Sequence, residues 1–150
     1  MQEMDTARDA EYMEALGRKV IHLARDDARQ FNPVAFVRVG TKHEIQDVMD
    51  VAAAVCPPVS HFDKCAFSII TALLLHGLHV RGKGFTLTEA YSAIKDPDIF
   101  EVLGQSDVET VRVIAREHTS GFVRSVHEAS GVVANATGAL SVFGKPVAAL

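Results

Sequence analysis

The sequence predicts an all-α fold, a single-domain orthogonal bundle of six or seven short helices around one buried central helix at about residues 61–76. The stretch from Cys65 to Leu75 contains only two polar residues, Ser68 and Thr71. Their hydroxyls can bond to the preceding helical turn, so a helix here is apolar on every side. Elsewhere, apolar residues recur at helical spacing between capping residues and prolines. The all-apolar helix therefore belongs at the centre, with amphipathic helices around it.

Length and charge limit the classes of protein that fit this chain. A chain of 150 residues is the size of one domain and can bury a sufficient core. The net charge of −4 argues against nucleic acid as the main partner, although a local basic patch is compatible with it.

Two cysteines are too few for a disulfide framework, and the acidic N-terminus has no apolar signal segment. We therefore expect a cytoplasmic or other intracellular setting, including a place in a larger particle. The longest apolar run, Cys65–Val80, is interrupted by polar residues and is shorter than the roughly 20 residues that span a bilayer, so we expect no membrane span.

The first helix is predicted over residues 6–31, where apolar residues form one stripe between charged ones. Asn32-Pro33 ends it, because the residue before proline avoids the helical region. The next segment, residues 34–39, is ambiguous. Its β-branched content favours a strand, with 79–80 or 85–87 as the available partners, whereas Asn32, Pro33 and Gly40 frame a short helix. We favour the helix slightly, and minor β pairing near 34–39 is the alternative.

Three later helix starts have the sequence of a capping box, in which a hydroxyl and a carboxylate satisfy free backbone N–H groups reciprocally. They are Thr41–Glu44, Thr86–Glu89 and Ser106–Glu109. The apolar spacing that follows predicts helices ending before Pro57, near Ile94, and beyond Gly121 with a bend at 119–121. A two-turn helix is also expected within Asp96–Gly104, with Asp96 as cap and Gly104 at its end.

The last twenty residues differ from the rest of the chain. Lys145 is their one charged side chain, and four glycines or prolines make a continuous helix unfavourable. We therefore divide the chain into a helical domain, 1–130, and an apolar C-terminal arm, 131–150, that packs on its own core or on a neighbouring subunit. The side chains expected to make this contact are Val132, Val133, Leu140, Val142, Phe143, Val147 and Leu150.

Two patterns near the end of the central helix resemble binding sites. Arg81 and Lys83 alternate with Gly82 and Gly84, so cations and backbone N–H groups there form an anion-binding candidate, with an ordinary solvated turn as the more common explanation. His76 and His79, completed by His61, His118 or a carboxylate, are candidate metal ligands. Gly77 is expected to end the helix between the first two, and no HExxH motif is present, so no metal and no cofactor are predicted.

The remaining chemical signals are weaker. Cys56-Pro57 with His61 nearby has the form of a short haem-responsive element, and Cys56 or Cys65 is a formal nucleophile, but neither has a recognisable third group. The helices on either side of Gly104 have the outline of a helix-turn-helix. Asp107 and Glu109, however, open the second of these helices, where DNA phosphates would lie.

No catalytic pattern appears, so the predicted function is a non-enzymatic protein–protein interaction or assembly component, such as an adaptor, connector or inhibitor. We expect it to act through a homo-oligomer or a protein partner, because most soluble assemblies are homo-oligomers. The alternatives are a helix-turn-helix DNA-binding regulator and a small metal- or haem-binding protein or enzyme that uses His76 and His79.

Overall fold

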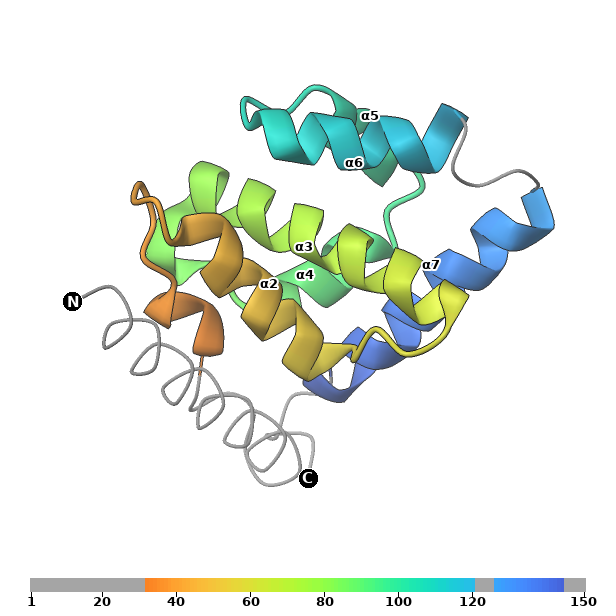
Figure 1. Ribbon diagram of the computed structural model, residues 1–150, viewed down its shortest axis with the longest axis horizontal. Coiled ribbons are helices and arrows are strands. Elements are labelled where there is room, and N and C mark those ends of the chain that lie inside the picture. The colour runs from red at the N-terminus through yellow and green to blue at the C-terminus, as the bar shows by residue number, and fades with distance from the viewer. Residues whose placement is uncertain (1–31, 121–125, 145–150) are drawn as a thin grey trace.

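The computed structural model describes residues 32–120 and 126–144, and the helix predicted over 6–31 lies outside this part of the chain. The described residues form six α-helices and three short 3-10 helices, with no strand among them, so the all-α prediction is confirmed. The elements, shown in Figure 1, are η1 (Pro33–Phe36), α2 (Glu44–Val55), α3 (His61–Arg81), η2 (Gly82–Gly84), α4 (Leu87–Ile94), α5 (Ile99–Gly104), α6 (Glu109–Ser120), α7 (Val126–Leu140) and η3 (Ser141–Phe143).

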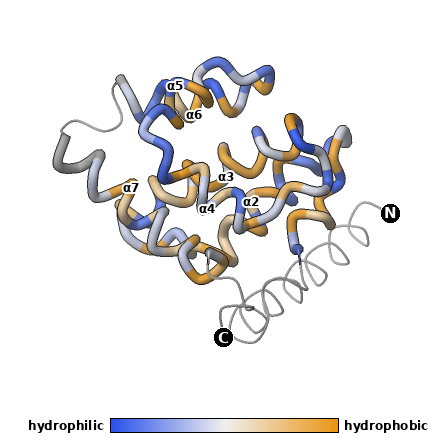
Figure 2. Tube along the Cα trace, turned by 180° about the vertical axis from the view of Figure 1, so that it is seen from behind, coloured by the Kyte–Doolittle hydropathy of each residue, from blue (hydrophilic) through white to orange (hydrophobic). Residues whose placement is uncertain are grey.

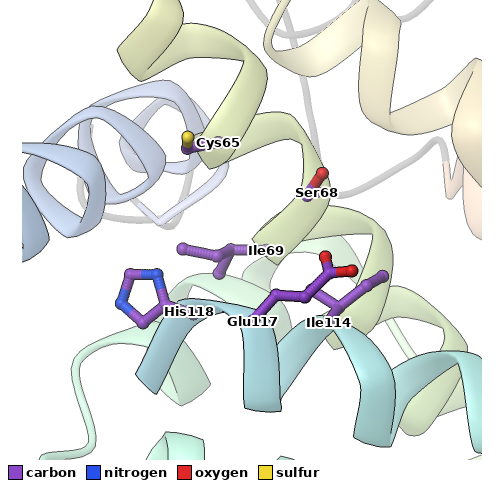
Figure 3. Close-up of a pocket in the computed structure, with 6 residues that line it drawn as sticks. All are labelled: Cys65, Ser68, Ile69, Ile114, Glu117 and His118. Atoms are coloured by element: carbon purple, nitrogen blue, oxygen red, sulfur yellow. The ribbon is translucent and has the colours of Figure 1, made fainter. Parts of the chain in front are cut away.

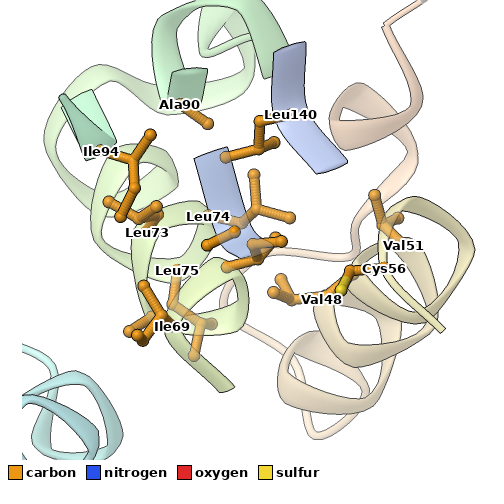
Figure 4. Close-up of a cluster of buried hydrophobic side chains, with 14 of the residues drawn as sticks. Val48, Val51, Cys56, Ile69, Leu73, Leu74, Leu75, Ala90, Ile94 and Leu140 are labelled. Carbon is orange, nitrogen blue, oxygen red and sulfur yellow. The ribbon is translucent and has the colours of Figure 1, made fainter. Parts of the chain in front are cut away.

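Helix α3 is the centre of the bundle, as its composition predicts. Ile70, Leu74 and Leu75 are completely buried, and Figure 2 shows hydrophobic stretches on this helix as well as on the helices around it. The helices α2, α4, α6 and α7 all pack against it. Figure 4 shows how they meet: Val48 and Val51 of α2, Ala90 and Ile94 of α4, and Leu140 of α7 converge on the leucines of α3.

The central helix is longer than the sequence suggested, because Gly77 does not end it. The helix continues to Arg81, and Gly82, with a φ of 75°, is the residue that stops it. Gly77 is buried against the ring of Phe85, and a Cβ atom at this position would lie 2.4 Å from that ring. The glycine therefore permits close packing inside the helix rather than marking its end.

The ambiguous segment 34–39 forms no strand in the described structure. Its first part is the 3-10 helix η1, with Pro33 at the start as expected. Asn32 makes no capping hydrogen bond and instead donates from Nδ2 to the carbonyl oxygen of Phe85 at 2.8 Å. Arg38 then forms a two-pronged ion pair with the buried Asp47, at 2.7 Å (Nη2 to Oδ1) and 2.8 Å (Nε to Oδ2).

The structure corrects the predicted helix caps. The Thr86 hydroxyl caps α4 by accepting from the N–H of Glu89, but the Glu89 carboxylate pairs with Arg81 instead of closing the box. A complete capping box occurs where none was predicted, at Ser60 and Asp63 before α3. The sequence pattern of a capping box has glutamate or glutamine three residues after the cap, whereas Asp63 occupies that position here, so the pattern did not predict this box.

The other two predicted boxes also differ from expectation. Thr41 accepts from the N–H of His43, and α2 begins only at Glu44. Ser106 accepts from the N–H of Val108, and the described part of α6 begins at Glu109. Likewise, α5 starts at Ile99 with Asp98 at the N-cap position, two residues later than Asp96 as cap would place it.

The C-terminal segment is a continuous helix despite its glycines. Helix α7 runs across the expected boundary at 130–131 and is followed directly by η3. Val132, Ala136 and Leu140 are completely buried, because their spacing of four residues places them on the face that meets α3 and α4. Tertiary packing of this face outweighs the low helix propensity of Gly131 and Gly138.

Helical segment His61–Gly84 is 24 residues long, so its length and composition alone would allow it to cross a membrane. This segment is longer than the apolar run Cys65–Val80, whose length was the reason for expecting no membrane span. Of its most apolar part, 61% is buried by the rest of the described chain. The core helix of a bundle has these same properties, so the segment is only weak evidence for a membrane span.

Candidate functional site

Three of the candidate metal-binding histidines have different polar partners. Nδ1 of His76 lies 3.0 Å from Oγ of Ser106, and Nε2 of His79 lies 2.6 Å from Oε1 of Glu44. His61 lies one turn before Cys65, with Nε2 4.0 Å from Sγ. Within residues 32–120 and 126–144, no three side chains of the His, Cys, Asp or Glu type are placed to hold a metal ion.

The anion-binding candidate lies on the surface at the end of α3. Arg81 and Lys83 are exposed, and Nη2 of Arg81 contacts Oε1 of Glu89 at 3.3 Å. The N–H of Gly82 bonds to the carbonyl oxygen of Leu78, and its own carbonyl accepts from Phe85. The basic residues and glycines are thus neighbours, but they serve as the C-terminal cap of α3 and the turn into α4.

Both cysteines are buried thiols that form no disulfide. Sγ of Cys56 lies 3.8 Å from the carbonyl oxygen of Asp63, and burial, with a contribution from the Asp63 charge, raises the pKa of the Cys56 thiol. A higher pKa leaves less of the thiolate that would act as a nucleophile or metal ligand.

The helices α5 and α6 form a hairpin that packs along one side of α3 (Figure 1). Asp107 and Glu109 are exposed at the start of α6, and Nη1 of Arg112 donates to the carbonyl oxygen of Ser106 at 2.6 Å. The acidic end of α6 and the internal use of Arg112 both oppose phosphate binding at this end.

A small pocket between α3 and α6, shown in Figure 3, was not found by the sequence analysis. Its volume is about 20 Å³, room for a water molecule and too small for an organic ligand. It is lined by Cys65, Ser68 and Ile69 of α3 and by Ile114, Glu117 and His118 of α6.

His118 is the titratable group that the hairpin buries most deeply among those described. Its side chain is 8% exposed, and its ring stacks on Phe100 of α5 at 4.0 Å between centroids, with 16° between the ring planes. Burial lowers the pKa of His118 from its ordinary value. The imidazole is therefore held in its neutral form more strongly than a histidine in water.

The side of α7 that faces away from the core has an unusual composition. Its exposed positions are Ser130, Ala134 and Gly138, followed by Val142 of η3, which is 51% exposed. We call these four residues the α7 outer face. Residues 130–144 contain no Asp, Glu, Lys or Arg, whereas the exposed residues of α6 include Glu109, Arg116 and Glu117.

The expected contact residues of the C-terminal arm thus divide into two groups. Val132, Leu140 and Phe143 are buried, and Val133 is partly buried against the same core. Val142 is exposed, and Val147 and Leu150 lie outside the described residues. Two polar contacts also attach this part of the chain: Asn135 Nδ2 donates to Asp63 Oδ1 at 3.0 Å, and Thr88 Oγ1 donates to the carbonyl oxygen of Phe143 at 2.6 Å.

The described part of the chain is thus an all-α helical domain with a buried apolar core and a water-sized pocket between α3 and α6. No family model matches it, and no solved structure shows a significant match. The chain is similar to conjugal transfer protein TraG of Escherichia coli, with 28% identity over 135 residues. The alignment covers 79% of this chain but only 21% of TraG, so the chain spans about a fifth of the length of that relative.

Proposed function

We propose that this protein is a non-enzymatic assembly component that forms protein–protein contacts through the α7 outer face and acts as a homo-oligomer in the cytoplasm. The observation that carries the proposal is an exposed helix face without charge on an acidic, otherwise charged protein. The distant similarity to a conjugal transfer protein, at 28% identity, supports the same class.

The physical argument starts from the usual composition of a surface helix. Such a helix shows an apolar stripe to the core and charged residues to water. Helix α7 has the apolar stripe, in Val132, Ala136 and Leu140, but Ser130, Ala134 and Gly138 occupy the opposite side. Small side chains let the backbone of a second helix approach closely, and uncharged ones lose little hydration energy when they are covered.

The proposal is tested by placing one charge on this face. We expect Ala134→Arg to abolish self-association, because the guanidinium would be buried without a partner in the contact. Arg is a good helix former and position 134 is exposed, so the isolated domain should keep its stability. The matched control is Val113→Arg, which replaces an exposed apolar residue of α6.

Sedimentation velocity over a range of protein concentrations measures the effect, with thermal unfolding by circular dichroism as the folding check. The proposal predicts an oligomer for the wild type and for Val113→Arg, and a monomer for Ala134→Arg. A wild type that is monomeric at every concentration, or an oligomer that tolerates Ala134→Arg, would overturn it.

A further inference from the structure

The α5–α6 hairpin is attached to the bundle by a surface that contains two imidazoles. Among the described elements the hairpin packs mainly on α3, through α6 (Figure 1). His76 of α3 reaches the turn of the hairpin, and His118 of α6 stacks on α5 beside the pocket that separates α6 from α3. In the docked hairpin His118 is buried and His76 is partly buried.

We propose that the α5–α6 hairpin is a proton-sensitive flap, in which neutral His118 and His76 hold it against α3 and protonation of these rings releases it. The step is the uptake of one proton by each imidazole, at the ring nitrogen that carries none in the neutral form, with no bond broken in the chain. The proposal concerns the hairpin alone and does not depend on the α7 outer face.

The geometry at His118 makes a charge there costly. The ring is 8% exposed and lies between Phe100 of α5 and a pocket whose α3 side consists of Cys65, Ser68 and Ile69. The carboxylate that lines the pocket belongs to Glu117, the residue before His118 in α6. Glu117 is exposed, so its carboxylate attracts a protonated His118 only weakly. A cation over the face of Phe100 recovers part of the hydration energy that burial removes.

His76 adds a second contact to the same docking surface. Its Nδ1 lies 3.0 Å from Oγ of Ser106, a side chain that is 4% exposed and also accepts from the N–H of Val108. This single hydroxyl therefore connects α3 to the turn that begins α6. Asp107 faces the ring and favours its protonation, while His79, one turn along α3, opposes it.

The direction of the pH effect follows from these surroundings. Burial lowers the pKa of both rings from the ordinary 6.5, and at His76 this outweighs the attraction of Asp107. The docked hairpin consequently binds fewer protons than the released one, so docking is fully stable above pH 6.5 and weakens as the pH falls towards the lowered pKa values. Each ring can contribute up to about tenfold in the docking equilibrium per pH unit in that range.

Hydrogen–deuterium exchange of the full chain, corrected for the intrinsic pH dependence of amide exchange, tests this directly. Amides of α5 and α6 should lose protection relative to those of α2 by about tenfold or more between pH 7.5 and pH 5. The double variant His118→Phe/His76→Asn keeps a ring on Phe100 and a polar atom near Ser106 but cannot titrate. It should show the same ratio of hairpin to α2 protection at both pH values.

The matched control is His43→Asn, which removes a histidine just before α2 and should leave the wild-type response unchanged. Two results would overturn the proposal. One is a wild type whose hairpin and α2 protection change in parallel between the two pH values, a measurement that needs no variant. The other is a double variant that folds and still loses hairpin protection in acid.

Discussion

Replacing Gly77 by alanine tests the packing at the centre of the bundle. In a helix interior, glycine to alanine normally stabilises by roughly 1 kcal/mol, because glycine loses more backbone freedom on folding. At Gly77 the new Cβ would lie 2.4 Å from the ring of Phe85, far inside van der Waals contact. The ring cannot move outward freely, since Phe85 is 6% exposed and its backbone bonds to both Gly82 and Asn32.

The expected magnitude is the difference between these two effects. Forcing an extra carbon into a filled core costs about 1–3 kcal/mol. With the propensity gain set against it, Gly77→Ala should lower the free energy of unfolding by up to about 2 kcal/mol. Gly138→Ala is the matched control, because it makes the same change in α7 with no atom within 4 Å of the new Cβ, and it should stabilise by about 1 kcal/mol.

Urea unfolding of the two variants at low protein concentration measures this difference. A second cycle places Gly77→Ala in a Phe85→Leu background, where the obstructing ring is gone and the alanine should become neutral or stabilising. If Gly77→Ala and Gly138→Ala stabilise equally in the wild-type background, the close approach of Phe85 is not what selects glycine in α3.

Three further predictions concern polar groups. Asp47→Asn should destabilise by about 2–3 kcal/mol in urea unfolding, less than the roughly 3–5 kcal/mol for a fully buried pair, because the Arg38 side chain is 37% exposed. Burial alone would raise the pKa of Asp47, but the contacts with Arg38 lower it overall. The stabilisation by this ion pair is therefore present above pH 3.8 and is lost as the pH falls through the lowered pKa. The Asp47→Asn variant should lack this acid-sensitive part of the stability. Ser60→Ala should cost about 1 kcal/mol in thermal unfolding through loss of the α3 cap, and an unchanged melting temperature would contradict that role. Cys56 and Cys65 should react with a disulfide reagent only as fast as the protein opens, and a burst of labelling in the native protein would show that a thiol is accessible.

Part of the fold could be predicted because it depends on local composition. The run around Cys65–Leu75 is apolar on all sides, and no amphipathic alternative exists for it, so its central position followed directly. Thr71 returns its hydroxyl to the carbonyl oxygen of Phe67 at 2.9 Å, as a threonine in such a helix was expected to do. The helices ending near Val55 and Ile94 were likewise located by their spacing.

The candidate site could be predicted only in part. The low charge of the last twenty residues marked them as unusual, but spacing alone did not show that Val132 and Leu140 face the core while Ala134 and Gly138 face outward. The stack of His118 on Phe100 joins residues from two helices, so the spacing within either helix could not indicate it. The signal that could have separated the two faces was side-chain size, since the large residues Val132 and Leu140 lie on one side at helical spacing and the small residues Ala134 and Gly138 on the other.

The sequence by itself determined the helical class and the central helix, because periodicity, caps and an all-apolar run act over a few turns of chain. The tertiary structure alone decided where α3 ends, since Gly77 serves as a stop or as a packing site depending on whether a ring such as that of Phe85 approaches it. It also decided that 126–140 is one helix, because the contacts of Val132, Ala136 and Leu140 with distant elements outweigh the local preference of the glycines. Contacts between residues far apart in the chain supply this energy, and no short window of sequence contains both partners.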